Sequence, residues 1–326
     1  MTAPLSMLIV GAGFGGLGAA IHRRRCGDDN FLLVEQAGGV GGTWWANRYP
    51  GAACDIPSHL YSFSFAPNPH WTRRYPAQPE IEAYLNDCVQ RFGLAPRLRL
   101  HTRLSYLHWD EVQHLWRARV LDAAGQEHEL LARTVTLATG PLSRPAAPLL
   151  FGLERFEGPV IHTARWPDEF DAGGRSIGVI GTGASAIQLV PQLARQAKQL
   201  TVFQRSAPWV LPRGDAPIAP ALRWLLHHLP PLRRAWRAAI YARHEFRAPA
   251  FTVNPSWLQA LEPLALKHLK SRVPAGALRD ALTPDYRMGC KRILIADDYY
   301  PALRLPQVTL ETTPIAEVEL QGVRLA

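Results

Sequence analysis

Residues 7–16 read MLIVGAGFGG, an apolar run that leads directly into a glycine-rich turn. The same arrangement returns at residues 177–186, which read IGVIGTGASA. Each turn is followed by a second apolar run, FLLV at 31–34 and LTVF at 200–203. Strand, glycine turn, helix and strand form a dinucleotide-binding unit, because the glycines let the backbone approach a pyrophosphate at the helix N-terminus. The chain therefore predicts an α/β fold with two dinucleotide-binding, Rossmann-like domains of three layers each.

The residue after each second strand distinguishes the two units. Glu35 and Arg205 follow the first glycine of their turn at the same interval of 24 residues (35 − 11 and 205 − 181). An acid here accepts hydrogen bonds from a free ribose diol, as in FAD or NAD, whereas an arginine pairs with the 2′-phosphate of NADP. The alternative for Arg205 is an exposed arginine at a strand end. The predicted ligands are Gly11, Gly13, Phe14, Gly16 and Glu35 in the first unit, and Gly181, Thr182, Gly183, Ala184, Ser185, Arg205 and Ser206 in the second.

Length and composition are those of an ordinary globular protein. The 326 residues are 47% hydrophobic and 19% charged, which suggests about two domains. No apolar stretch reaches membrane-spanning length, and no basic leader with a cleavage site precedes the first strand. The four cysteines lie far apart without a C-x-x-C pair, which argues against a disulfide framework, a metal site and a redox dithiol. These features predict a cytoplasmic protein.

The net charge of +9 raises the question of an anionic partner. The basic residues are spread along the chain, which argues against nucleic acid. Their densest cluster, residues 223–247, predicts two helices broken at Pro230 and Pro231, with one basic and one apolar face. We favour a solvated face on a helical insertion over a membrane-surface helix.

The order of the patterns predicts the domain boundaries. The first domain covers residues 1–150, a linker covers 151–175, and the second domain covers 176–326 with a helical insertion at about 215–285. Within them we expect a helix over 79–92, a hairpin of 115–121 with 129–139, a strand over 292–295 and late strands over 308–311 and 318–320.

The linker carries the most specific pattern. It reads Phe156-x-Gly158-x-x-x-His162-x-x-x-Trp166-Pro167, a spacing that follows neither helix nor strand periodicity and so indicates a specific loop conformation. It resembles the fingerprint of Baeyer–Villiger monooxygenases. The related N- and S-oxygenating flavin monooxygenases share its first part but usually lack the Trp-Pro ending.

Further segments extend the resemblance over most of the chain. GGTW at 41–44, RYPGA at 48–52, CDI at 54–56, YSFS at 61–64 and QPE at 78–80 are similar to the family's flavin-side segments. FQRS at 203–206 and GCKRIL at 289–294 are similar to its NADP-side segments.

The resemblance implies site residues beyond the two turns. Thr43, Trp44, Asp55 and Tyr61 would line the flavin, and Lys291 would join Arg205 at the 2′-phosphate. Arg292 matches the active-site arginine, with Asp55 positioning it, although a loop-capping carboxylate is the alternative for Asp55. His162 could exchange a proton, but its place in the linker favours a conformational role.

The implied activity is oxygen insertion beside a ketone carbonyl, with FAD, NADPH and O₂ giving an ester or lactone. The alternatives are N- or S-oxygenation, or a catalytically silent NADP-binding protein. A dithiol-dependent reductase is disfavoured by the cysteine spacing. The family's chains continue past the position of Ala326, so we expect the last part of the FAD domain to be absent. The sequence specifies neither the ketone nor the oligomeric state.

Overall fold

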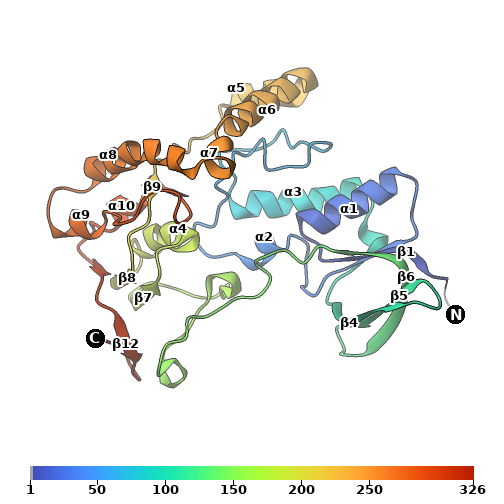
Figure 1. Ribbon diagram of the computed structural model, residues 1–326, viewed down its shortest axis with the longest axis horizontal. Coiled ribbons are helices and arrows are strands. Elements are labelled where there is room, and N and C mark those ends of the chain that lie inside the picture. Colours follow the sequence, from blue (N-terminus) through green and yellow to red (C-terminus); the bar gives the residue numbers. More distant parts are fainter. Residues whose placement is uncertain (1–2) are drawn as a thin grey trace. The chain divides into compact units, whose positions relative to one another are not determined.

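The computed structural model describes residues 3–326 and divides into two compact units (Figure 1). The first comprises Met1–Arg48 and Gln78–Ala146, the second Tyr49–Ala77 and Ala147–Ala326. The segment Tyr49–Ala77 thus belongs to the second unit, whereas the sequence interpretation placed it in the first domain. The reason is packing, since Tyr49 and Ala52 are buried in the hydrophobic core of the second unit.

The first unit is built on a six-stranded sheet in the order β3-β2-β1-β6-β5-β4. Its strands are β1 Leu5–Val10, β2 Phe31–Val34, β3 Leu98–Arg99, β4 Arg103–Asp110, β5 Leu115–Leu121 and β6 Glu127–Leu137. The first four strands in this order pair in parallel, and β6, β5 and β4 form an antiparallel meander. The predicted hairpin is confirmed as β5 and β6. Strand β1 has a parallel partner on each side.

Helices cover one face of this sheet (Figure 1). They are α1 Phe14–Arg25 and α3 Gln78–Arg91; the unit also contains α2 Thr43–Ala46 and the 3₁₀ turn η1 Ala95–Arg97. The helix predicted over 79–92 is confirmed as α3, and it buries its apolar stripe, including Ile81 and Leu85. On the opposite face Leu8 and Val10 pack against Ala118 and Ala132 of the meander. Because side chains alternate along β1, the strand packs against the helices on one face and against the meander on the other.

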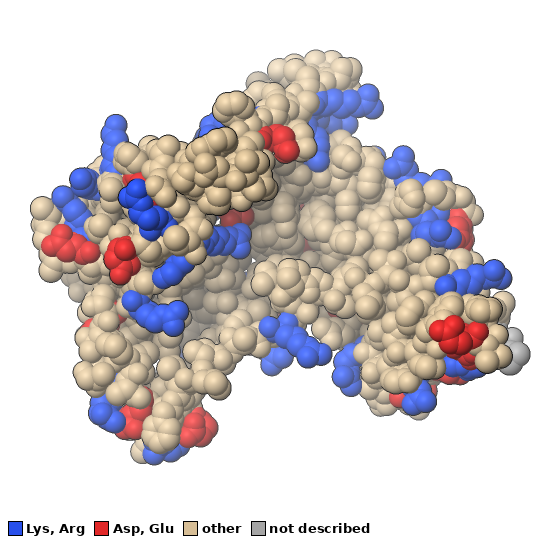
Figure 2. Space-filling model, viewed as in Figure 1, with Lys and Arg blue, Asp and Glu red and all other residues tan. Residues whose placement is uncertain are grey.

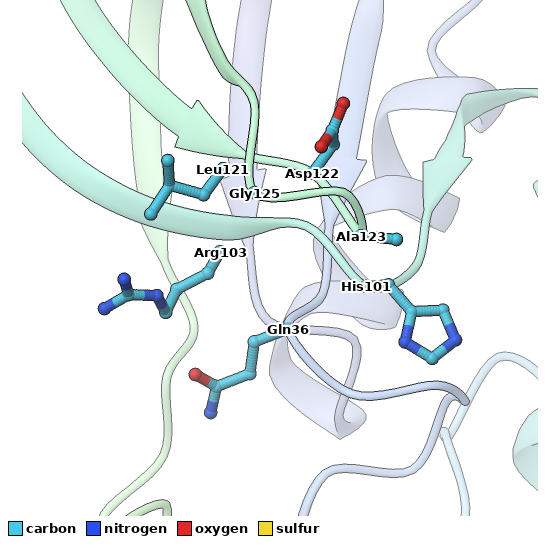
Figure 3. Close-up of a pocket in the computed structure, with 7 residues that line it drawn as sticks. All are labelled: Gln36, His101, Arg103, Leu121, Asp122, Ala123 and Gly125. Carbon is cyan, nitrogen blue, oxygen red and sulfur yellow. The ribbon is translucent and has the colours of Figure 1, made fainter.

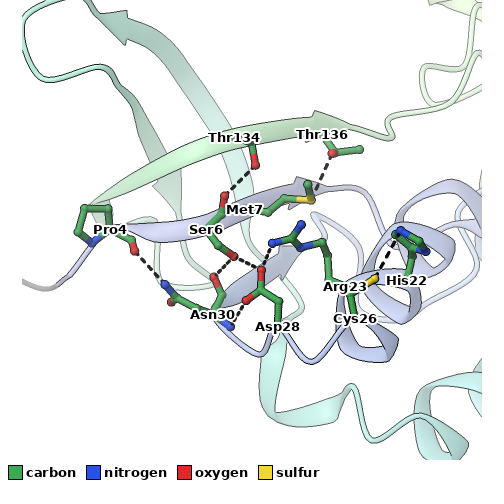
Figure 4. A network of polar contacts seen from close by, with 10 residues as sticks. All are labelled: Pro4, Ser6, Met7, His22, Arg23, Cys26, Asp28, Asn30, Thr134 and Thr136. Carbon is green, nitrogen blue, oxygen red and sulfur yellow. Dashed lines mark hydrogen bonds and ion pairs between the residues drawn. The ribbon is translucent and has the colours of Figure 1, made fainter.

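A polar network fixes the turn between α1 and β2 (Figure 4). The carboxylate of Asp28 binds the guanidinium of Arg23, accepts a hydrogen bond of 2.7 Å from Ser6 Oγ and one of 2.8 Å from the Asn30 N–H. One side chain thus joins the end of α1 to β1 and to the start of β2. This network holds the strand–turn–helix–strand unit together at the end opposite the glycine turn.

The second unit contains a three-stranded parallel sheet in the order β11-β8-β7. Its strands are β7 Ser176–Ile180, β8 Gln199–Phe203 and β11 Val308–Glu311, and two small pairs accompany them, β9 Val210–Leu211 with β10 Leu294–Ile295 and β12 Ile315–Val318 with β13 Val323–Leu325. Helices α4 Ala184–Leu193 and α10 Tyr299–Ala302 contribute to the core around Leu200 and Val202. Strand β10 begins at Leu294, so Arg292 precedes it rather than lying in the strand predicted over 292–295.

A helical insertion separates β9 from β10, within the predicted range. It contains α5 Pro220–His228, α6 Pro230–Glu245, α7 Pro249–Thr252, η4 Pro255–Leu261, α8 Glu262–Arg272 and α9 Ala277–Ala281. Pro230 and Pro231 begin α6, because proline lacks the N–H that would continue α5 and suits the first turn of a helix. The connector before β7 contains the 3₁₀ turns η2 Leu153–Arg155 and η3 Thr163–Arg165.

Charged side chains of both signs are distributed over the face in Figure 2. Within residues 3–326 no helix is long and apolar enough to cross a membrane. The same residues contain no group of three or more His, Cys, Asp or Glu side chains that could hold a metal ion. All four cysteines are free thiols. Burial raises the pKa of the Cys54 thiol to about 12, which keeps it protonated and unreactive.

Candidate active site

The first glycine turn joins β1 to α1 inside the core of its unit. Gly11 has φ +102° and donates its N–H to the Val34 carbonyl at 2.8 Å. A Cβ on Gly11 would lie 2.5 Å from the Ala138 carbonyl oxygen, and one on Gly16 would collide with the carbonyl oxygen of Gly11. Only glycine therefore allows the turn and helix to approach β6 and each other this closely.

Glu35 is a structural part of this turn. The side chain is 8% exposed, and its two oxygens accept hydrogen bonds from the N–H groups of Ala12 at 2.7 Å and Ala37 at 2.8 Å. The carboxylate thus ties the glycine turn to the chain that leaves β2. Each oxygen retains a second lone pair that could accept a ribose hydroxyl.

The glycine-rich loop after β2 returns to the same turn. The Gly41 N–H donates to the Ala12 carbonyl at 3.0 Å, and a Cβ on Gly42 would lie 3.1 Å from the Cα of Gly13. Thr43 and Trp44 begin α2 directly after this contact. The loop therefore brings two of the predicted flavin ligands to the first turn.

A cavity of about 480 Å³ opens beside the residue that follows Glu35 (Figure 3). It is lined by Gln36, His101, Arg103 and Leu121 and by Asp122, Ala123 and Gly125 of the β5–β6 turn. None of these residues was predicted as a ligand. The sequence did not predict this grouping, because Arg103 begins β4 and lies far along the chain from Gln36, which follows β2.

The second glycine turn repeats the backbone of the first in an open environment. Gly181 has φ +104°, and its N–H donates to the Phe203 carbonyl at 3.0 Å. Gly183 precedes α4 with φ −77° and ψ −173°, close to the values of −80° and −169° at Gly13. A Cβ on Gly181 or Gly183 would meet no atom within 4 Å. Packing against neighbouring residues therefore does not require glycine at either position.

Cationic side chains lie beside this second turn. Lys291 Nζ donates to Ser206 Oγ at 2.7 Å, and Thr182 Oγ1 donates to the Ser206 carbonyl at 3.2 Å. Arg205 is exposed, and within residues 3–326 its guanidinium forms no hydrogen bond or ion pair. The Arg205 guanidinium, together with the Lys291 ammonium group, is suited to binding a phosphate.

Arg292 and Asp55 form an ion pair across 237 residues of sequence, with Nη2 to Oδ2 at 3.0 Å. Both belong to the second unit. The Arg292 side chain is 69% exposed and that of Asp55 34% exposed, so the pair is open to solvent. A permanently charged guanidinium held in this way could stabilise an anion that approaches it.

The segment that carries Asp55 is anchored on both sides of it. Gln188 of α4 donates to the Ala53 carbonyl at 2.9 Å and accepts from Tyr49 Oη at 2.8 Å. Arg213 donates to the Cys54 carbonyl at 2.9 Å. These contacts position Asp55 from α4, the helix that begins at the second glycine turn. Sequence reasoning did not find Gln188, because its partner lies far away along the chain.

The fingerprint of the linker folds onto itself and onto the second unit. His162 Nδ1 accepts from the Ala164 N–H at 3.1 Å, which caps η3. A Cβ on Gly158 would lie 2.6 Å from the ring of Phe156, and Trp166 packs edge-on against Phe170 at 5.3 Å. The spacing of the pattern thus corresponds to specific turn and ring contacts.

The structure divides the predicted ligands between the two units. The first unit contains Gly11, Gly13, Phe14, Gly16, Glu35, Thr43 and Trp44; the second contains Asp55, Tyr61, Gly181, Thr182, Gly183, Ala184, Ser185, Arg205, Ser206, Lys291 and Arg292. Asp55 and Tyr61, predicted with the flavin, therefore lie in the unit that holds the second turn.

Two strand–glycine turn–helix units, one followed by an acid and one by an arginine, are typical of the α/β nucleotide-dependent oxidoreductases. The family model for pyridine nucleotide-disulphide oxidoreductases matches residues 5–228. A Baeyer–Villiger monooxygenase of Streptomyces coelicolor is 45% identical over 310 residues, which are 95% of this chain and 59% of that protein. The chain belongs to the Baeyer–Villiger monooxygenase family, within this wider oxidoreductase family.

Solved structures agree with this assignment. Oxidized steroid monooxygenase bound to NADP matches with a TM-score of 0.84 and 33% identity over 99% of this chain and 69% of that one. A complex of OTEMO with FAD and NADP matches with a TM-score of 0.85 and 26% identity over 100% of this chain and 69% of that one. The chain spans about three fifths of the length of the curated relatives it matches.

Proposed function

We propose that this chain belongs to a Baeyer–Villiger monooxygenase, which uses FAD, NADPH and O₂ to convert a ketone into an ester or lactone. The observation that carries the proposal is the ion pair of Arg292 with Asp55. Oxygen insertion beside a carbonyl passes through anionic species, and a fixed guanidinium stabilises negative charge as it develops. The similarity to Baeyer–Villiger monooxygenases supports the same reaction.

The residues present fit both dinucleotides. Helices α1 and α4 begin without a side-chain cap and without an acid in the first turn, so their N–H groups are available to a pyrophosphate. Arg205 and Lys291 supply positive charge for a 2′-phosphate, and the oxygens of Glu35 can accept ribose hydroxyls. A flavin bound here supplies the redox chemistry that activates O₂.

Each residue then has a stated role. The first turn with Glu35 holds the ADP part of FAD, and Thr43, Trp44, Asp55 and Tyr61 line the flavin ring. Residues 181–185 hold the NADPH pyrophosphate, while Arg205, Ser206 and Lys291 hold its 2′-phosphate. Arg292 orients and stabilises the oxyanion, and Asp55 positions Arg292. We extend the proposal to the fold, in which each unit is one three-layer dinucleotide-binding domain, and to a cytoplasmic location, where the cysteines stay reduced.

The test compares the purified chain with Arg292→Ala and Arg292→Lys after incubation with FAD. We measure the flavin absorbance spectrum, ketone-stimulated NADPH oxidation with cyclohexanone as probe, and the ester product. Arg292→Ala should lower ester formation by about 10² to 10³-fold, and Arg292→Lys should retain part of it. Arg287→Ala is the matched control, since Arg287 is also exposed and paired, with Glu262.

Unchanged ester formation by Arg292→Ala would show that the assigned role is wrong. Oxygenated amine or sulfide without ester would instead support the N- or S-oxygenating alternative. NADPH binding without retained flavin, even with added FAD, would support a catalytically silent nucleotide-binding protein.

A further inference from the structure

Two arginines of helix α6 face the protein, and several of its apolar side chains face solvent. Arg237 Nη1 donates to the carbonyls of His59 at 2.5 Å and Leu60 at 3.3 Å, and Arg233 Nη1 donates to the Leu226 carbonyl of α5 at 3.2 Å. None of the sixteen residues of α6 is buried. Arg233 and Arg237 therefore help to hold the helix to its unit, whereas Arg234 and Arg243 are exposed, as the sequence predicts for a solvated basic face.

One side of α6 exposes large apolar side chains. Leu232, Trp236 and Phe246 are 38%, 40% and 89% exposed, and residues at these positions lie on one side of a helix. We define the outer face as Leu232, Trp236 and Phe246; further large apolar residues are exposed in the neighbouring elements, namely Trp224, Leu229, Phe251, Val253 and Trp257. Exposed large apolar side chains on one side of a helix mark an interaction surface, because exposed apolar residues are otherwise mostly isolated.

The charge around the outer face is almost all positive. Between Asp215 and Glu262 the sequence contains six arginines and a single acid, Glu245. Arg234, Arg243 and Arg247 are exposed, and their guanidinium groups form no ion pair or hydrogen bond within residues 3–326. Figure 2 shows the α5–α6 projection mostly in tan, with blue side chains beside it. An occupant of this face must be both apolar and anionic.

We propose that the outer face docks on an anionic lipid surface. Trp, Tyr, Phe and Leu beside arginines are the composition of helices that lie in the membrane interface, where rings enter the acyl boundary and guanidinium groups reach the headgroups. The face belongs to α6 and the residue that follows it, in the α5–α6 pair (Figure 1). This association is peripheral, and it does not depend on the proposed oxygenation.

The experiment is co-sedimentation of the full chain with vesicles of phosphatidylcholine and phosphatidylglycerol in equal parts, compared with phosphatidylcholine alone. Binding should be at least about tenfold stronger to the anionic vesicles and should weaken with salt. Trp236→Ser with Phe246→Ser should lower partitioning by about tenfold or more. Arg243→Gln with Arg247→Gln should lower it by about twentyfold, since each arginine near the surface contributes about fivefold.

The control is Val112→Ser with Leu149→Ser, which removes two highly exposed apolar side chains from other parts of the chain. It should bind as the unmodified chain does, and circular dichroism should show all variants folded. No binding to anionic vesicles, or equal binding by the outer-face and control variants, overturns the proposal. A concentration-dependent dimer that dissociates in Trp236→Ser with Phe246→Ser, without vesicle binding, assigns the face to a second copy and also overturns it.

Discussion

The two glycine turns have nearly the same backbone and very different surroundings. Gly11 and Gly181 have φ of +102° and +104°. Strand β1 lies between β2 and β6, whereas β7 pairs with β8 alone within the described residues. A Cβ at Gly11 would overlap a neighbouring carbonyl, and one at Gly181 would meet nothing. The local glycine motif therefore determines the path of the backbone. The surrounding residues determine whether, beyond this path, a glycine is required by close packing, as at Gly11, or only by the approach of a ligand, as at Gly181.

The largest difference in stability between the two turns should come from the third glycine position. This position is Gly16 in the first turn and Ala186 in the second. Gly16→Ala should lower the free energy of unfolding by about 3 kcal/mol, because the added Cβ meets the Gly11 carbonyl within the same turn. Urea denaturation measures it. Gly15→Ala is the control, since its Cβ would make an ordinary contact at 3.5 Å with Ala138. Equal stability of the two variants would contradict the packing role of the first turn.

Low pH should lower the stability of the second unit, because this unit contains the buried His59. Burial, reinforced by Arg237 and Arg233, lowers the pKa of His59 to about 4. An unfolded histidine takes up a proton below pH of about 6.5, so stability should fall as the pH decreases from there towards 4 and then level off. The loss is roughly 3 kcal/mol. Urea titrations at a series of pH values should show this slope, with His59→Gln removing it and exposed His22→Gln keeping it.

Arg205→Ala should separate ligand binding from stability. Loss of an arginine–phosphate contact should weaken NADPH binding by about 30 to 100-fold while leaving NADH binding nearly unchanged. The free energy of unfolding should change by less than about 0.5 kcal/mol, because Arg205 is exposed and unpaired among the described residues. Isothermal titration measures both affinities. Equal weakening for the two nucleotides would exclude the 2′-phosphate role.

The smallest effect on stability should come from Gly183→Ala. Its φ of −77° suits alanine, and the added Cβ would meet open space, so stability should change by less than about 0.5 kcal/mol. NADPH affinity should nevertheless fall about tenfold, because the Cβ occupies the approach to the pyrophosphate. Unchanged affinity would mean that the second turn does not bind the nucleotide through its backbone.

Much of the fold was predictable from local patterns. Helix α3, the β5–β6 hairpin, both strand–turn–helix units and the position of the helical insertion follow from periodicity, proline and glycine. The strand predicted from Arg292 was wrong in its first two residues, because only Leu294 and Ile295 pair with β9. The helices of the insertion were predicted, but not which side of α6 contacts the protein.

The site was predictable as a set of residues but not as an arrangement. Resemblance to a family pointed to Asp55 and Arg292, and only folding placed them 3.0 Å apart. Gln188 and Arg213, which hold the segment around Asp55, were not predicted, because each bonds a partner far along the chain.

The sequence by itself determined the two turns, since positive φ at glycine and short apolar runs are local properties that need no distant partner. Tertiary structure alone decided that Tyr49–Ala77 belongs to the second unit, that Arg292 meets Asp55, and that Arg233 and Arg237 of α6 bond to backbone carbonyls of the protein. These depend on contacts between residues far apart in the chain, whose formation is governed by the burial of whole faces rather than by any single residue.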